Sequence, residues 1–201
     1  NFPNIEGFGV WAAKCNFTMG PDGKMYSRML GGNLVRIDVE NARGENLTNG
    51  DLVGTKDGSA YGLVFDPQDE NVFYFSNNDK HCIYKYDLRT KECACWAGQE
   101  GKSGYLDGPI GQAMFNKPGQ MCVDSEGNII LTDTENHCIR KITMSTGYVS
   151  TLAGKPQNSG YVNGSAEDAQ FKKPLGICID NDDVMYIGDS ENRAIRRLAV
   201  E

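Results

Sequence analysis

The two histidines, His81 and His137, are the side chains of this 201-residue chain best suited to acid–base or metal chemistry. Imidazole titrates near neutral pH and is a common ligand of divalent metals. The two residues stand 56 positions apart (137 − 81 = 56), and each falls in a turn between two expected strands. Equivalent turns of adjacent repeats lie too far apart to share one metal, so we interpret both histidines as turn residues of a repeat.

Cysteine supplies the second set of reactive side chains, seven in all. No two pairs of them have the spacing of a zinc site. Four cysteines fall on shared repeat positions, Cys82 with Cys138 and Cys122 with Cys178, and we interpret them as small buried hydrophobic residues. Cys93 and Cys95 stand two residues apart on an expected strand, where they point the same way and do not easily bridge each other.

Asp133 and Asp189 also recur 56 residues apart (189 − 133 = 56), which suggests a role in acid–base catalysis. Asn77 occupies the corresponding place one repeat earlier. An Asn can cap a turn by accepting backbone N–H bonds but cannot replace a catalytic carboxyl group. We therefore interpret these residues as turn caps and predict no catalytic residue. No nucleophile elbow, phosphate loop or dinucleotide fingerprint occurs in the sequence.

An internal repeat must position all these residues. When residues 97–142 are aligned with residues 153–198, without a gap, 17 of the 46 positions are identical. Unrelated sequences of this composition would match at roughly three positions. A third copy covers about residues 60–97 and a degenerate copy about residues 10–48.

Each copy divides into four short strands separated by turn residues. In the copy at about 115–153, the expected strands are 120–124, 129–132, 138–143 and 148–152. The last copy, about 171–201, lacks its outer strand. A four-stranded antiparallel unit cannot bury both faces alone, and radial stacking of such units buries them. The sequence therefore predicts an all-β chain, a β-propeller with about four blades present in a single domain.

The repeat resembles the NHL repeat. The residues that carry the resemblance are Phe115, Pro118, Asp124, Gly127-Asn128, Asp133, Asn136-His137, Ile139-Arg140, Ile142 and Thr151-Leu152-Ala153-Gly154. NHL propellers usually have about six blades, so the resemblance implies that the four copies are part of a six-bladed ring. The loops between copies are similar to those of long-loop bacterial members, envelope proteins in which an immunoglobulin-like domain precedes the propeller. That similarity implies an extracytoplasmic location, at the periplasm or cell surface.

Two long loops, 99–116 and 155–172, are the candidate ligand-binding feature. Each carries Gly-Tyr-x-(Asp/Asn)-Gly, which places Tyr105 with Asp107 and Tyr161 with Asn163. Propellers place such connections around one face, near the central channel, where these side chains could stack on and hydrogen-bond a sugar or peptide. The alternative is that each tyrosine packs under its own loop and each Asp or Asn caps a turn.

Composition excludes some partners. The net charge is −7 and the pI about 4.9, and no basic run occurs, so we expect no nucleic-acid partner. No apolar stretch is long enough to span a membrane. The chain starts Asn1-Phe2 without a signal pattern, so we expect that a leader has been removed or that the chain is part of a longer polypeptide.

Two main functions stay open at this stage. One is a non-catalytic scaffold that presents its loops to a protein or glycan and needs no cofactor. The other is a metal-dependent hydrolase or lyase of the lactonase type, which by resemblance would hold Ca²⁺ or Zn²⁺ with residues of the inner strands. The starts of those strands, residues 119–121 and 175–177, offer few metal ligands, which favours the scaffold. A purely structural module is a third hypothesis.

Overall fold

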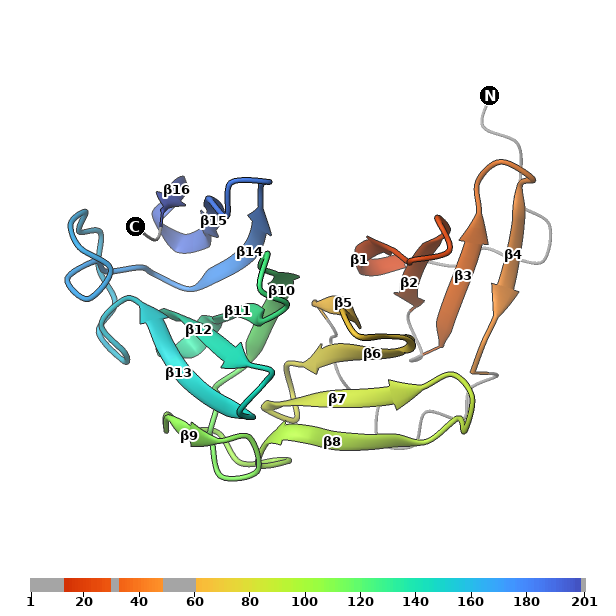
Figure 1. Cartoon of the computed structure of the whole chain (residues 1–201). Coiled ribbons are helices and arrows are strands. Elements are labelled where there is room, and N and C mark those ends of the chain that lie inside the picture. Colours follow the sequence, from red (N-terminus) through yellow and green to blue (C-terminus); the bar gives the residue numbers. More distant parts are fainter. Residues whose placement is uncertain (1–12, 30–32, 49–60, 200–201) are drawn as a thin grey trace.

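Four antiparallel sheets make up the protein in a computed structural model, which describes residues 13–29, 33–48 and 61–199. The sheets follow one another along an open arc, with the first and the last at its two ends (Figure 1). We call them blades 1 to 4 in chain order. This architecture confirms the predicted all-β propeller fold with four blades.

The strands of each blade are consecutive in the sequence. Blade 1 consists of β1 (Ala13–Met19), β2 (Met25–Met29), β3 (Leu34–Asp38) and β4 (Arg43–Asn46). Blade 2 consists of β5 (Leu63–Asp66), β6 (Asp69–Asn77), β7 (Cys82–Asp87) and β8 (Cys93–Gly98). Blade 3 consists of β10 (Pro118–Val123), β11 (Ile129–Asp133), β12 (Cys138–Thr143) and β13 (Tyr148–Ala153). Blade 4 has the three strands β14 (Pro174–Ile179), β15 (Met185–Asp189) and β16 (Ala194–Leu198).

Blade 3 also carries a short outer strand that the sequence did not predict. Strand β9 (Gly108–Pro109) pairs with β13, with Tyr148 opposite Pro109 and Val149 opposite Gly108. It belongs to the long loop that precedes the blade. This part of the loop therefore extends the outer edge of the sheet.

Period-two patterning explains which residues are buried. In blade 3, Ile129 lies opposite Ile142, which lies opposite Val149, and all three are fully buried. The turn between β10 and β11 needs a left-handed residue, which Gly127 supplies with φ +83°. Short 3₁₀ turns (Thr134–Asn136 and Ser190–Asn192) join the second and third strands of blades 3 and 4.

The hydrophobic core lies between blades. One cluster joins blades 2 and 3 through Tyr74, Ile83, Met121 and Leu131, with Phe115 from the long loop. Similar clusters join blades 1 and 2 and blades 3 and 4. Blades 2 and 3 thus bury both faces, and blades 1 and 4 each bury the face that meets their one described neighbour.

Glycines let the inner strands approach closely. A Cβ on Gly62, just before β5, would lie 2.8 Å from the carbonyl oxygen of Gly119 in β10. A Cβ on Gly119 would in turn lie 3.0 Å from the carbonyl oxygen of Leu175 in β14. No side chain fits at either place without moving a neighbouring backbone, so these glycines set the spacing of blades 2, 3 and 4 around the inner surface.

Candidate ligand-binding site

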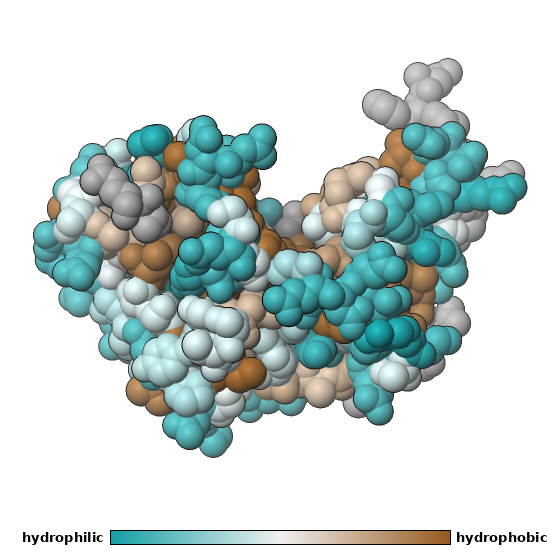
Figure 2. Space-filling view, viewed as in Figure 1, coloured by the Kyte–Doolittle hydropathy of each residue, from teal (hydrophilic) through white to brown (hydrophobic). Residues whose placement is uncertain are grey.

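A hollow of about 830 Å³ lies where the inner strands of the four blades face one another. Strands β1, β5, β10 and β14 supply its walls. Figure 2 shows hydrophobic residues in the recess between the two ends of the arc. Such a volume is in the range of small-molecule pockets in proteins.

The wall of the hollow includes large apolar side chains and is partly open to solvent. Phe17 and Met19 on β1 are 49 % and 60 % exposed, and stand two residues apart, on the same face of the strand. Across the hollow lie Met121 on β10 and Ile177 on β14, both buried. Two large exposed apolar side chains facing a recess are a feature that a ligand or partner commonly covers.

Polar groups are gathered at one edge of the hollow. Asp66 ends β5, Gln68 lies in the turn that follows, and Glu70 lies near the start of β6. Gln120 contributes a further amide, whose Oε1 accepts a hydrogen bond from the backbone N–H of Ile177 at 3.1 Å. This bond joins β10 to β14 and fixes the wall between blades 3 and 4. The hollow thus combines an apolar wall with an acidic edge.

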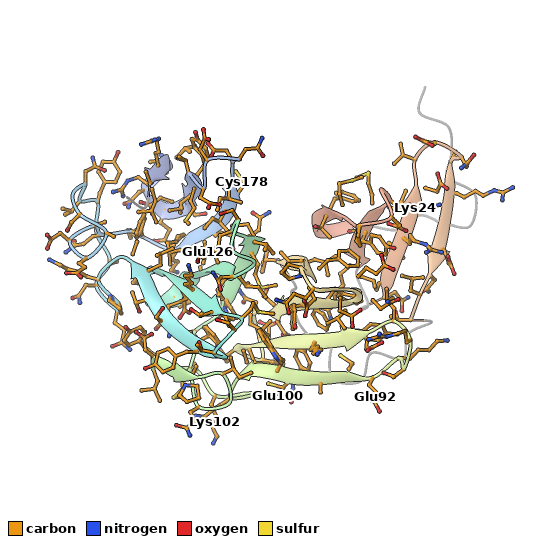
Figure 3. The ribbon with its side chains drawn as sticks, in the orientation of Figure 1. Lys24, Glu92, Glu100, Lys102, Glu126 and Cys178 are labelled. Atoms are coloured by element: carbon orange, nitrogen blue, oxygen red, sulfur yellow. The ribbon has the colours of Figure 1, made fainter. Side chains whose placement is uncertain are left out.

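Two thiols line the hollow at the same position of consecutive blades. Burial raises the pKa of Cys122 to about 12, so its thiol stays protonated at neutral pH. Cys178 is exposed and lies on β14 (Figure 3). The expectation of a buried hydrophobic residue holds for Cys82 and Cys138 and is wrong for Cys178, because its strand has no further blade against it in the described structure.

The Tyr105 loop lies elsewhere, on the outer edge of blade 3. The Tyr105 ring lies 4.9 Å from the guanidinium carbon of Arg140, and its hydroxyl shares a 2.7 Å hydrogen bond with the hydroxyl of Thr151. Asp107 Oδ1 accepts from Arg140 Nη2 at 2.5 Å, and Asp107 Oδ2 accepts from the backbone N–H of Thr151 at 3.1 Å. The expected place beside the central channel is therefore wrong, because Arg140 holds both side chains against the outer strand.

Blade 4 repeats this arrangement, and no outer strand covers it among residues 13–29, 33–48 and 61–199. Arg196 Nη2 donates to Asn163 Oδ1 at 2.8 Å, and its guanidinium carbon lies 4.9 Å from the Tyr161 ring. Tyr161 is nevertheless 61 % exposed, and Asn163 is also exposed. Of the four loop residues predicted to contact a ligand, these two are the more accessible.

In blades 3 and 4, the arginine that holds the loop also forms a buried ion pair with an Asp of the neighbouring strand. Arg140 Nη1 donates to Asp133 Oδ2 at 2.7 Å, and both side chains are fully buried. Arg140 also donates to the carbonyl oxygens of Leu106 and Met114 in the loop. Burial raises the pKa of Asp133 to about 6, and the nearby Arg140 charge opposes that rise. At neutral pH the pair is therefore ionised and holds the loop to the sheet.

The interpretation of Asp133 as a cap of its own turn is wrong. Its Oδ1 accepts from the backbone N–H of Asn116, 17 residues earlier, and its Oδ2 also accepts from Asn136 Nδ2. Asp133 connects the end of the long loop to the sheet, because Arg140 on the next strand points into the same buried space. The sequence contained a signal for this: Arg140 alternates with the buried residues Cys138 and Ile142, so period two places its charge inside.

The histidines join neighbouring blades. His81 Nδ1 accepts from the backbone N–H of Lys117 at 3.1 Å, and His137 Nδ1 accepts from that of Lys173 at 3.2 Å. Each bond runs from a turn of one blade to the start of the next inner strand. The backbone of both histidines has positive φ in those turns. The prediction that they are turn residues of the repeat agrees with this position.

We expect acid to weaken the His81 contact. Burial, then the Lys117 charge, lower the pKa of His81 below its ordinary 6.5. An imidazole whose pKa falls on folding binds fewer protons when folded, so its stabilisation is present above the unfolded pKa of about 6.5 and is lost as pH falls from there through the lower folded pKa. Urea unfolding at about pH 7.5 and 5.5 should show a loss of stability that is smaller in His81→Asn, because Asn tolerates the left-handed turn but does not titrate. An equal pH dependence in both proteins would contradict this assignment.

Two classes of site do not occur in the part of the chain that the structure describes. Residues 13–29, 33–48 and 61–199 contain no group of three or more His, Cys, Asp or Glu side chains placed to hold a metal ion. The same residues form no helix of the length and hydrophobicity that crossing a membrane requires.

Comparison with known proteins identifies the family of the repeat. The family model of the NHL repeat matches residues 115–142. This chain carries NHL repeats. The matched segment begins at Phe115 and contains Asp133, Asn136 and Arg140, so the NHL motif includes the residues of the buried network that fastens the loop to its blade.

Relatives of this NHL propeller are known in sequence and in structure. The NHL repeat-containing protein 2 of Gallus gallus is 30 % identical over 152 residues, which are 75 % of this chain and 19 % of that protein. A protein of unknown function from Bacteroides thetaiotaomicron is 28 % identical with a TM-score of 0.83, covering 92 % of this chain and 46 % of that one.

A second solved structure from the same bacterium is described as an auxiliary nutrient binding protein. It is 28 % identical to this NHL propeller, with a TM-score of 0.72 and coverage of 90 % of this chain and 46 % of that one. A streptogramin B lyase, 16 % identical with a TM-score of 0.65, shares the fold alone. The chain thus spans less than a fifth of the curated relatives' length and about half the length of these solved structures.

Proposed function

We propose that this NHL propeller is a non-catalytic binding protein whose ligand enters the hollow between the inner strands. The observation that carries the proposal is the pair of exposed apolar side chains, Phe17 and Met19, on the wall of a cavity of about 830 Å³. Burying such side chains under a ligand releases water from apolar surface and favours binding. The similarity to a protein described as nutrient binding supports the same class of function.

Of the two ligand classes, protein and glycan, the hollow favours a protein ligand, which would insert an apolar peptide segment. Sugar hydroxyls need several convergent hydrogen-bonding side chains, and here the amide of Gln120 is already engaged with Ile177. The acidic edge formed by Asp66 and Glu70 would attract a basic group beside the apolar segment. A peptide with adjacent hydrophobic and basic residues is therefore the proposed ligand.

Tyr161 and Asn163 form a second candidate contact surface, which keeps the loops in the proposal. The exposed ring of Tyr161, stacked on one side against Arg196, offers a flat face of the kind on which sugars and peptides stack. Tyr105 and Asp107 are more enclosed, and they would act mainly by holding the loop in shape.

The proposal requires no cofactor. The alternative, a metal-dependent hydrolase or lyase, would need Ca²⁺ or Zn²⁺ on the inner strands. Elemental analysis of the purified protein distinguishes the two: a stoichiometric metal would favour the enzyme, and its absence after exposure to both ions would favour the binding protein. We further propose an extracytoplasmic location, which the resemblance to envelope proteins supports, and a protein partner rather than nucleic acid.

Substitution of Met19 tests the position of the ligand site. We expect Met19→Asp to weaken binding of the neutral probe N-phenyl-1-naphthylamine at least about tenfold, because the change removes apolar contact and adds a charge that binding would desolvate. Val39→Asp is the matched control, since Val39 is 62 % exposed in the same blade but lies outside the hollow. The measurement is fluorescence titration, repeated with hydrophobic-basic peptides and oligosaccharides as competitors.

The outcome of that titration separates the two surfaces. Loss of binding in Met19→Asp alone supports the hollow. Equal losses in Met19→Asp and Val39→Asp, or a loss only in Tyr161→Ala, would contradict it. Displacement of the probe by an oligosaccharide and by none of the peptides would overturn the proposed ligand class.

A further inference from the structure

Three thiols are gathered on one face of blade 2. Cys82 begins β7, and Cys93 and Cys95 belong to β8. Cys95 lies opposite Tyr84, and Cys93 lies opposite Tyr86, so all these side chains point to the same side of the sheet. The face packs against blade 1, where the thiols join Tyr26 and Leu34 in one hydrophobic cluster.

This face has lost the ion pair that fastens the later blades. Tyr84 stands where blade 3 has Arg140, and Asn77 stands where it has Asp133. Cys95 likewise replaces Thr151, the residue that receives the long loop. The Asn77 amide nitrogen is buried without a hydrogen-bond partner. The space is therefore not organised by a polar network as in blade 3.

The register brings Cys82 and Cys95 together. The pairing of β7 with β8 shifts by one residue between Ile83 and Tyr84, so Trp96 is the extra residue of a bulge. Cys95 is thus a diagonal neighbour of Cys82 across the two strands. Cys95 Sγ lies 3.7 Å from the carbonyl oxygen of Gly98, and Gly98 is the residue opposite Cys82, so the Cys95 thiol is directed toward Cys82.

The two thiols differ in access and in acidity. Cys82 is fully buried, whereas Cys95 is partly exposed. The neighbouring Cys82 thiol lowers the pKa of Cys95, and the neighbouring Cys95 raises the pKa of Cys82. Burial raises the pKa of Cys93 to about 11. An accessible thiolate beside a protected thiol is the arrangement of a reactive and a resolving cysteine.

We propose that Cys82 and Cys95 are a peroxide-sensitive dithiol that closes a disulfide between β7 and β8. The Cys95 thiolate attacks one oxygen of hydrogen peroxide, the O–O bond breaks, and hydroxide leaves as water after taking a proton. Cys95 then carries a sulfenic acid. Cys82 loses its proton and attacks the Cys95 sulfur, the S–O bond breaks and a second water forms. The two thiols are oxidised by two electrons in all, and one peroxide is reduced to two waters.

The disulfide would change blade 2 and not the ligand hollow. Closing it draws β8 toward β7 and covalently fixes the outer strand of the blade, next to the contact with blade 1. Neither Cys82 nor Cys95 lines the hollow, so the inference stands whether or not the proposed function is correct.

Mass spectrometry of the reduced, folded protein after peroxide treatment tests the pair. We expect a Cys82–Cys95 cross-linked peptide and the loss of two hydrogen atoms from the intact protein. Before oxidation, iodoacetamide should label Cys95 at least about tenfold faster than Cys93, because only the thiolate reacts. Cys93→Ser is the control that should still form the disulfide, and Cys95→Ser should abolish it.

The opposite results would overturn the inference. These are a Cys93-containing disulfide as the main product, no disulfide in the folded wild-type protein, or equal alkylation of Cys95 and Cys93. The alkylation rates are measured on the wild-type protein, so they decide the matter even if a serine variant fails to fold.

Discussion

Replacing Arg140 with Met should lower the free energy of unfolding by about 3–5 kcal/mol, because it leaves Asp133 as a buried charge without its partner. The substitution also removes the donors that Arg140 gives to Asp107 and to the carbonyl oxygens of Leu106 and Met114. Urea denaturation measures the loss of stability. Hydrogen exchange should rise at Leu106 in particular, since the loop would lose its attachment to the sheet.

A double substitution and a surface control define this prediction further. Arg140→Met combined with Asp133→Leu should recover a large part of the stability, because no buried charge then remains. Arg89→Met is the matched control: Arg89 also pairs with two Asp side chains, Asp87 and Asp69, but is 55 % exposed. We expect it to behave as an ordinary surface substitution. An Arg140→Met protein as stable as Arg89→Met would contradict the assigned role of the buried pair.

Phe115→Ala should cost about 3–5 kcal/mol, because it opens a cavity in the core between blades 2 and 3. Phe115 is fully buried, packs in the cluster that joins these blades, and has the Arg140 guanidinium carbon 5.2 Å from its ring. Its position at the end of the long loop means that the same substitution should also loosen that loop. Thermal and urea unfolding give the stability, and limited proteolysis reports on the loop.

Phe17→Ala is the control for this core substitution. Phe17 is 49 % exposed on the wall of the hollow, so its removal should leave stability nearly unchanged and weaken probe binding. A large loss of stability in Phe17→Ala, together with a small one in Phe115→Ala, would mean that the core lies elsewhere than between the blades.

The repeat made most of the fold predictable. The 56-residue repeat aligned equivalent strands and turns of successive blades, so the position of each strand could be predicted. The expected strand at 138–143 is the observed β12. Strand β9 was missed because Gly108 and Pro109 have low strand propensity and are held only by pairing with β13. The buried role of Arg140 was missed for a related reason: a charge is expected at the surface, and only the pairing of three distant segments provides its partners.

The candidate site was less predictable than the fold. Phe17 and Met19 lie in the degenerate copy, where no alignment singles out a position, and an exposed Phe or Met has no sequence signal of its own. The loop residues drew attention because they repeat, and they repeat because Arg140 and Arg196 hold them. The residues that recur between copies therefore stabilise the fold. Blade 1, the degenerate copy, supplies the exposed apolar side chains on the wall of the hollow.

Alkylation of Cys178 shows directly whether the hollow is the place of binding. Its thiol is exposed on the wall of the hollow, so iodoacetamide should reach it in the free protein. With N-phenyl-1-naphthylamine or a bound peptide at saturation, we expect peptide mass spectrometry to show slower alkylation of Cys178 and an unchanged rate at Cys95. Saturating ligand that leaves the rate at Cys178 unchanged would contradict a binding site between the inner strands.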